Sequence, residues 1–166
     1  MPTEFRDIAE EFERRWKRIV WCSVTTVDTK GRPRSRVLHP IWEGPVGWIA
    51  THRDSLKAKH LAQNPYVSLS YLEILKPFGT EQIHAECKTV WDDSPETRKR
   101  IWRLLESTPP PVGYDPQGFW KSAEDPRFGV LRLTPWRIEL TSLKTTGWTQ
   151  QVWQPISCFT RTVTLR

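Results

Sequence analysis

The amino-acid sequence predicts a mainly β protein of the α+β kind, in which about six antiparallel strands form a closed or nearly closed barrel with flanking helices. Two observations support this prediction. Short segments rich in β-branched and aromatic residues recur along the chain, and turns with glycine or proline separate them. Only three segments carry helical spacing. A chain of 166 residues with 37% apolar content has the size of one domain, so we expect residues 1–166 to form a single one.

The first third of the chain predicts a helix followed by three strands. Within residues 1–18, apolar side chains recur every three or four positions with charges between them, which is typical of an amphipathic helix. The next segments are rich in β-branched and aromatic residues, and the turn sequences TKGRP and EGP separate them. We expect an antiparallel meander from three strands, residues 19–28, 34–42 and 46–51.

The rest of the chain alternates helices and strands. Asp54 or Ser55 can cap a short helix that Asn64-Pro65 ends, and Ser94-Pro95 can begin a longer one. Pro135-Trp136 joins two closing strands. We expect further strands at residues 66–73 and 82–91, a proline-rich loop at 107–118 and a loosely held tail at 155–166.

Composition limits the classes of function. The net charge of +6 and the isoelectric point near 9.5 favour anionic ligands. Three cysteines without a Cys-x-x-Cys or Cys/His cluster argue against a zinc site or a disulfide framework, so we expect no metal site. The charged N-terminus is unlike a signal peptide, and no apolar run approaches the length of a membrane span. We therefore expect a cytoplasmic protein with no membrane partner.

A phosphate site is one interpretation of the residues around the first short helix. Thr51 ends a strand, Ser55 stands at the helix start and Lys57 lies in its first turn, where backbone N–H groups lack intrahelical partners. The alternative is that Ser55 only caps the helix and Lys57 is a solvated surface lysine.

The basic strand before it supplies a second set of candidates. In a regular strand Arg34, Arg36 and Leu38 face one side, and Val37 and His39 face the other. The two arginines would form a fork beside a bound anion, although a charge run is more often a solvated face. A histidine on an apolar face is more often a hydrogen-bonded core residue than a catalyst, but its pKa would suit proton transfer.

The order of these motifs resembles the pyridoxamine 5'-phosphate oxidase-like family of flavin-binding split β-barrels. The segments RSRVLH, WIAT and SLKAKHLAQNPYVSL carry the resemblance, together with RLTPWRIEL near the end, and it extends over residues 20–141. It implies a split β-barrel. It also implies cofactor contacts from the strand at Arg34, Arg36, Val37 and Leu38, and from Ala50, Thr51, Ser55, Lys57 and Gln82.

The resemblance implies an FMN-binding oxidoreductase with a small-molecule substrate, working as a homodimer with the cofactor at the interface and without nucleic acid. A flavin carries out the hydride transfer, and the protein positions it. His39 is the nominated catalytic residue. Two departures argue against pyridoxamine phosphate oxidation itself: Leu56 stands where the family has arginine, and the closing segment IELTSLKTTGW lacks the family's Arg-x-His substrate motif.

Other hypotheses for the ligand and the function remain. The deazaflavin coenzyme could replace FMN, since Lys30, Arg32 and Lys59 are available for a longer acidic tail. The same fold could bind haem or store flavin without turnover. From a different class, basic charge with aromatic residues could indicate a nucleic-acid-binding barrel. The basic and apolar helix ETRKRIWRLLE could instead serve a structural interaction protein.

Overall fold

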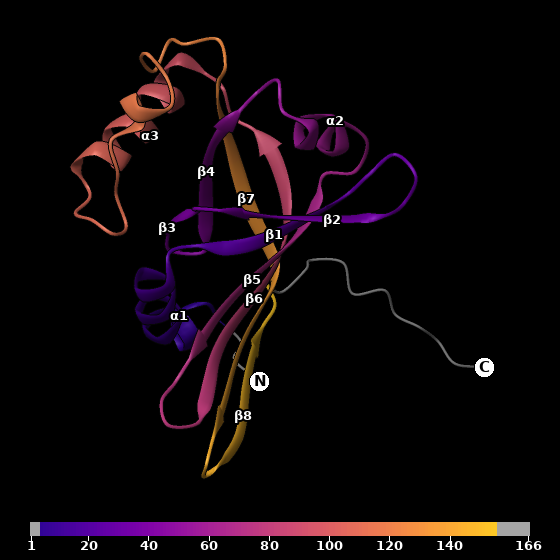
Figure 1. The fold of residues 1–166 in the computed structure, drawn as a ribbon, viewed down its shortest axis with the longest axis vertical. Coiled ribbons are helices and arrows are strands. Elements are labelled where there is room, and N and C mark those ends of the chain that lie inside the picture. Colours follow the sequence, from indigo (N-terminus) through magenta and orange to yellow (C-terminus); the bar gives the residue numbers. More distant parts are fainter. Residues whose placement is uncertain (1–3, 156–166) are drawn as a thin grey trace.

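The computed structural model describes residues 4–155 (Figure 1). Nearly all of the expected tail at 155–166 therefore lies outside the described residues. The helices are α1 (Arg6–Ile19), α2 (Leu56–Gln63) and α3 (Pro95–Ser107), with a short 3-10 turn at Pro116–Gly118. The strands are β1 (Cys22–Val27), β2 (Pro33–Leu38), β3 (Ile41–Glu43), β4 (Val46–His52), β5 (Tyr66–Ile74), β6 (Gly79–Trp91), β7 (Phe128–Lys144) and β8 (Gly147–Trp153).

The strands form one antiparallel sheet in the order β2-β1-β5-β6-β7-β4-β3, and β8 pairs with the second half of β7. The mainly β prediction is confirmed. The expected number of strands is wrong, because eight strands rather than six occur within residues 4–155. Backbone hydrogen bonds do not close the sheet, since β2 and β3 are its two edges. The described fold is therefore a barrel that is split, not sealed.

The split lies at His39-Pro40. The segment 34–42, expected as one strand, is divided here into β2, which pairs with β1, and β3, which pairs with β4. Proline has no N–H for a sheet ladder and restricts the backbone of the residue before it. The chain therefore leaves one edge of the sheet and joins the other (Figure 1). The expected meander is wrong at this step.

The two closing strands are one long strand, β7, with a bulge. Glu86 pairs with Arg137 and Cys87 with Pro135, so Trp136 is the extra residue. A bulge accepts a proline inside a sheet, since the ladder is already interrupted there. On either side of the bulge β7 has a different second partner: its first half pairs with β4 and its second half with β8.

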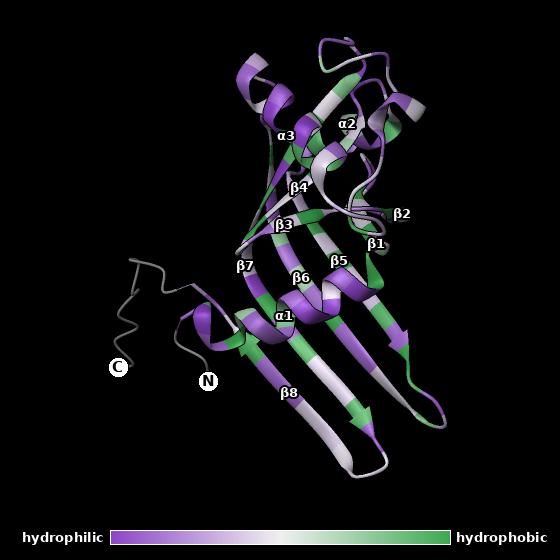
Figure 2. Cartoon of the chain, turned by 90° about the vertical axis from the view of Figure 1, so that its left-hand side faces the viewer, coloured by the Kyte–Doolittle hydropathy of each residue, from purple (hydrophilic) through white to green (hydrophobic). Residues whose placement is uncertain are grey.

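Helix α1 covers the inner face of the sheet (Figure 2). Its buried residues include Phe12, whose ring meets Trp42 edge to face at 5.0 Å between centroids. The Trp42 indole N–H donates to the hydroxyl of Tyr71, which is fully buried. Cys22 and Cys87 are buried free thiols. The core thus joins the helix, the short strand β3 and the centre of the sheet.

Buried charges between α1 and the sheet are neutralised by neighbours. The Arg15 guanidinium donates to the carbonyls of Gln82 and Thr141 at 2.8 and 2.7 Å. Glu81 accepts hydrogen bonds from Arg14 and Arg18. Burial opposes ionisation of Glu81, but these bonds outweigh it and lower the pKa of its carboxyl.

The other two helices begin in different ways. Ser94 caps α3 by accepting from the Thr97 N–H, as the sequence predicts. Ser55 stands at the start of α2 but makes no side-chain cap, so its hydroxyl is available to another partner. Of the helices within residues 4–155, none is long and apolar enough to cross a membrane.

We expect Tyr71→Phe to lower the free energy of unfolding by about 1–3 kcal/mol, because it leaves the buried Trp42 N–H without an acceptor. Urea unfolding followed by fluorescence measures the change. Tyr66→Phe is the control, since Tyr66 is more than half exposed and should change stability by less than about 0.5 kcal/mol. Equal stability of the two variants would contradict the structural role of the Tyr71 hydroxyl.

Candidate functional site

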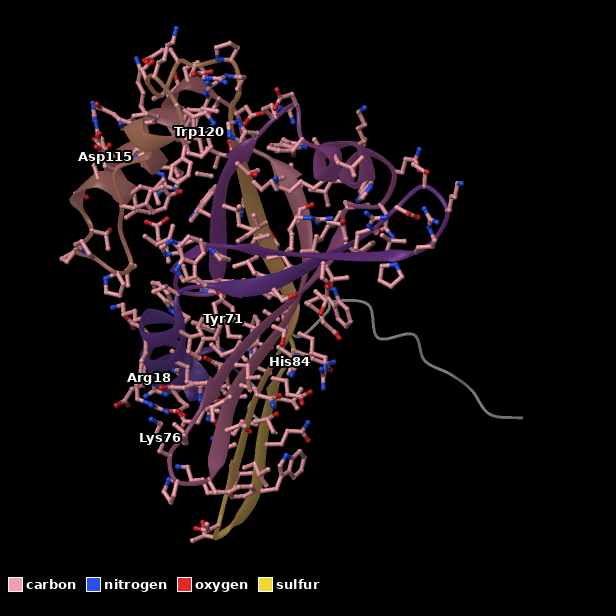
Figure 3. The ribbon with its side chains drawn as sticks, in the orientation of Figure 1. Arg18, Tyr71, Lys76, His84, Asp115 and Trp120 are labelled. Atoms are coloured by element: carbon pink, nitrogen blue, oxygen red, sulfur yellow. The ribbon has the colours of Figure 1, made fainter. Side chains whose placement is uncertain are left out.

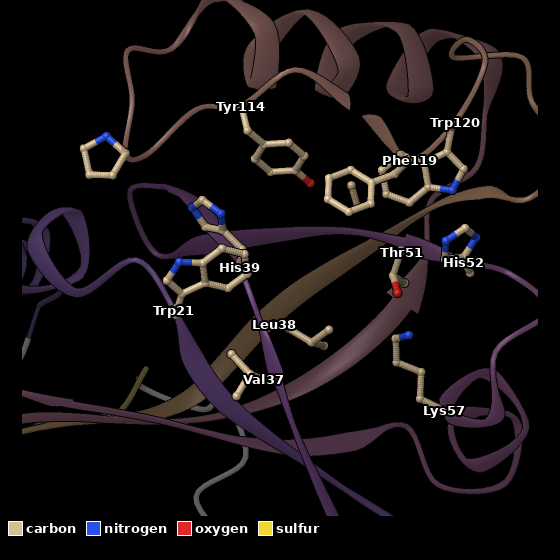
Figure 4. A pocket seen from close by; sticks show the side chains of 12 residues that line it. Trp21, Val37, Leu38, His39, Thr51, His52, Lys57, Tyr114, Phe119 and Trp120 are labelled. Carbon is tan, nitrogen blue, oxygen red and sulfur yellow. The ribbon is translucent and has the colours of Figure 1, made fainter. Parts of the chain in front are cut away.

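A cavity of about 550 Å³ lies between the end of β2, the end of β4, the start of α2 and the segment after α3 (Figure 4). Its volume falls within the range of pockets that hold small ligands. Most residues predicted for the site line it: Val37, Leu38, His39, Ala50, Thr51 and Lys57. Tertiary structure thus brings the basic strand and the first turn of α2 to one place.

The other predicted residues do not line this cavity. Arg34 is exposed on β2, and Arg36, two residues on, is partly buried. Ser55 lies next to the cavity, where its hydroxyl accepts from the Lys57 ammonium at 3.1 Å. Arg36 and Ser55 therefore act on Lys57 at the basic end of the cavity without lining it, and Arg34 acts on Arg36.

Gln82 lies elsewhere in the chain. Its side-chain oxygen contacts the His84 ring nitrogen at 3.0 Å, and both stand on the outer face of β6. Figure 3 shows His84 in the lower part of the sheet, well away from Trp120 at the cavity. Within one chain, Gln82 therefore lies apart from the other residues that the sequence predicts to contact the cofactor.

The basic end of the cavity holds two partly buried cations. Burial lowers the pKa of Lys57, and the charge of Arg36 lowers it further, while Asp54 acts in the opposite direction. Burial likewise lowers the pKa of Arg36, with a smaller effect from Arg34. Neither Lys57 nor Arg36 forms an ion pair with a carboxylate of residues 4–155. Two neighbouring cations without an ion-pair partner among the described residues favour an anionic ligand between them.

The Thr26 hydroxyl holds Arg36 in place. It accepts a hydrogen bond from the Arg36 guanidinium at 2.9 Å and lies 2.9 Å from Nδ1 of His60. Thr26 and His60 are both buried. This contact connects β1, β2 and α2, so it sets the position of the basic strand relative to the helix that carries Lys57.

The opposite side of the cavity is an aromatic wall, which we define as Pro111, Tyr114, Phe119 and Trp120. The wall belongs to the segment after α3, whose first part the sequence predicts only as a proline-rich loop. Trp21 and His52 complete the lining. Sequence reasoning missed these six residues. Three aromatic residues within seven positions, at 114–120, are the signal that could have indicated a binding surface.

His39 lies between the Trp21 and Tyr114 rings, with centroids 4.8 and 5.3 Å away. Burial lowers the pKa of the His39 imidazole, and a hydrogen bond to the Val112 backbone only partly offsets this effect. The buried Nε2 has no hydrogen-bond partner among the described residues. The ring is therefore neutral near pH 7, and Nε2 offers a lone pair.

We expect Thr26→Val to lower the free energy of unfolding by about 1–3 kcal/mol, since it leaves Arg36 and His60 without their shared partner. Denaturant unfolding with an unchanged m-value measures the loss. Thr25→Val is the matched control, because the Thr25 hydroxyl pairs with Ser35 at an exposed position. If both substitutions cost the same, the buried contact has no special role.

A family model described as pyridoxamine 5'-phosphate oxidase matches residues 8–142 of the chain. No curated protein matches the chain.

Solved structures from bacteria share the fold. A NimC/NimA family protein from Clostridium acetobutylicum is 18% identical with a TM-score of 0.63, covering 90% of this chain and 92% of that one. General stress protein 26 from Bacillus anthracis is 18% identical with a TM-score of 0.60, covering 78% and 93%. HutZ, a haem storage protein from Vibrio cholerae, is 15% identical with a TM-score of 0.60, covering 89% and 94%. At such identities the likeness concerns the fold alone.

Proposed function

Since the chain belongs to the pyridoxamine 5'-phosphate oxidase family, we propose that it is an FMN-binding oxidoreductase that acts on a small-molecule substrate. The observation that carries the proposal is the pair of partly buried cations, Lys57 and Arg36, at one end of an apolar cavity. A phosphate would supply an anionic partner for both cations, and the cavity would take the attached planar ring. The residues present therefore fit FMN.

Each part of the site would have its own task. Lys57 and Ser55 would hold the phosphate through charge-assisted hydrogen bonds, while Thr26 keeps Arg36 turned toward it. Val37 and Leu38 would exclude water from one face of the ring. A bound flavin supplies the hydride transfer, and the protein supplies orientation and hydrogen bonds.

His39 is the residue that we propose for proton transfer. His39 lines the cavity, and its buried Nε2 is an unpartnered lone pair that would accept a proton from a ligand that comes within reach. Pyridoxamine phosphate itself is not the proposed substrate, because Leu56 replaces the family's arginine and the Arg-x-His motif is missing. A cytoplasmic location also remains a proposal; the free thiols of Cys22 and Cys87 are consistent with it.

We also propose that two copies of the chain pair through the outer face of the sheet. Ile74 pairs with Thr80, which pairs with Leu143, which pairs with Trp148, so these side chains form a cross-strand row. Ile74, Leu143 and Trp148 are 76%, 37% and 59% exposed. An exposed apolar row of this kind is typical of an interface. Gln82 lies on the same face, so pairing there would allow it to serve the partner's site.

Haem is a second candidate for the same cavity. The observation that favours it is the neutral His39 ring with a free Nε2, because imidazole nitrogen is a common haem iron ligand. HutZ, which shares the fold, is a haem storage protein. The deazaflavin coenzyme is the third candidate. Lys59 and Arg53 lie near Ser55, beside the basic end of the cavity, where they would contact its longer acidic tail.

The visible absorption spectrum of the purified protein tests these candidates, followed by titration with FMN, haemin and the deazaflavin coenzyme. Flavin bands or tight FMN uptake would support the proposal. A haem Soret band, or a response to deazaflavin alone, would replace FMN by that cofactor. A colourless protein that binds only single-stranded oligonucleotides, with steep salt dependence, would support the nucleic-acid alternative.

We expect Lys57→Ala to weaken FMN binding by about 1.5–3 kcal/mol, the usual value of a charge-assisted hydrogen bond. Fluorescence titration of FMN measures the dissociation constant. Lys59→Ala is the control, since Lys59 is an exposed lysine of the same helix that does not line the cavity. An unchanged dissociation constant for Lys57→Ala would remove the proposed phosphate site.

For the dimer, we expect Ile74→Glu combined with Trp148→Glu to yield a monomer, because four negative charges at a two-fold interface repel each other in a desolvated patch. Analytical ultracentrifugation measures the mass. Val90→Glu is the control, since Val90 is 56% exposed at the other end of β6. A wild-type protein that sediments as a monomer would disprove the pairing.

A further inference from the structure

The aromatic wall faces β2 and β4 across the cavity (Figure 4). The Tyr114 and Phe119 ring centroids are 5.8 Å apart, and those of Phe119 and Trp120 are 5.5 Å apart. Such a surface offers large apolar ring area, and aromatic rings attract other flat rings through stacked or edge contacts. The wall is therefore suited to a flat ligand.

The wall is held firmly by α3 and β7. The Tyr114 N–H donates to the Leu105 carbonyl at 3.0 Å, so one end of the wall is attached to the end of α3. Arg98 of α3 donates to the Ala123 carbonyl at 2.8 Å, just after the wall. The Trp120 ring also packs on Phe128 at the start of β7, with centroids 5.0 Å apart. A binding surface anchored in this way loses little conformational entropy when a ligand binds.

Two residues that line the cavity each have a buried polar atom without a partner in the part of the chain that the structure describes. Trp120 is 4% exposed, and its Nε1–H donates to nothing there. His39 Nε2 likewise lacks a partner, and its other ring nitrogen is engaged with the Val112 backbone. A buried polar group without a partner costs about 1–3 kcal/mol, so such groups are rare unless a ligand or water completes them. A ligand with a hydrogen-bond acceptor would satisfy Trp120.

Charge limits the ligand further. Among the described residues that line the cavity, none is aspartate or glutamate. The lining instead includes Lys57, His39 and His52. A cationic ligand would find no counter-charge and would be repelled by Lys57. Neutral and anionic ligands fit this surface.

We propose that the aromatic wall binds the substrate, and that it selects a flat, neutral or anionic aromatic compound whose carbonyl or similar acceptor receives a hydrogen bond from Trp120 Nε1. This inference rests on the proposed function, because it assigns the wall to the substrate and the basic end to the cofactor. It names a substrate class that is distinct from an aliphatic or cationic one. Trp120 is then the residue that distinguishes acceptor-bearing rings from plain hydrocarbons.

Three probes of similar shape test the proposal. Menadione is a flat neutral naphthoquinone with carbonyl acceptors, 2-methylnaphthalene lacks the carbonyls, and 1-methylquinolinium carries a positive charge. Each is titrated calorimetrically into the protein with oxidised FMN and into the protein without FMN, in the absence of any reductant, so the readout is binding alone. We expect menadione to bind most tightly and 1-methylquinolinium most weakly.

Trp120→Phe keeps an aromatic ring but deletes the N–H donor. We expect it to weaken menadione binding about 3- to 30-fold, as loss of one hydrogen bond does, and to leave 2-methylnaphthalene binding unchanged within about 2-fold. Trp136→Phe, at the bulge of β7 and not lining the cavity, is the control and should change neither. FMN affinity, measured separately by absorbance, should stay within about 2-fold in both variants.

Phe119→Ala provides a second variant if Trp120→Phe folds poorly. Phe119 is 57% exposed, so its truncation should be tolerated, and it should weaken menadione and 2-methylnaphthalene alike. The inference is overturned if menadione does not bind to either preparation, if Trp120→Phe binds it as tightly as the wild type, or if 1-methylquinolinium binds equally well. If FMN does not bind but menadione does, with the expected loss in Trp120→Phe, the FMN proposal fails and the aromatic selectivity stands.

Discussion

The break of the sheet ladder at His39-Pro40 is the constraint on which the rest of this architecture depends. Without an N–H on Pro40, one extended segment becomes two strands, β2 and β3, at opposite edges of the sheet. The cavity lies beside this break, and the last residues of β2 form part of its lining. His39, the residue before the break, lines the cavity as well.

Buried polar groups between α1 and the sheet have partners, whereas two on residues that line the cavity have none within residues 4–155. Between α1 and the sheet, buried Arg15 and Glu81 have hydrogen-bond partners within the chain, so this side is completed by its own residues. Around the cavity, the buried nitrogens of His39 and Trp120 have none among the described residues. Trp48 Nε1 is also unpartnered, but Trp48 does not line the cavity. The cavity therefore differs from the rest of the described structure in combining two unpartnered nitrogens with the cation of Lys57.

The cavity is also polarised along its length. Lys57 and Arg36 stand at one end without a carboxylate partner within residues 4–155, and the aromatic wall stands on the other side. This separation suits a cofactor with an anionic tail and a flat ring, and it leaves the wall for a second flat molecule. The shared Thr26 hydroxyl links the basic strand to α2, so the anionic end depends on packing between three elements.

Local rules are enough to predict several elements from the sequence: the apolar stripe of α1, the Ser94 cap of α3 and most strand segments. The motif of a basic strand and a lysine-bearing helix can also be recognised in the sequence, because residue type and order suffice for that resemblance. The pairing of strands, the bulge at Trp136 and the position of Gln82 away from the cavity become visible only in the three-dimensional fold. The aromatic wall, too, is apparent only in the folded chain. Strand partners and cavity walls come from residues far apart in the chain, and no local pattern encodes such distances.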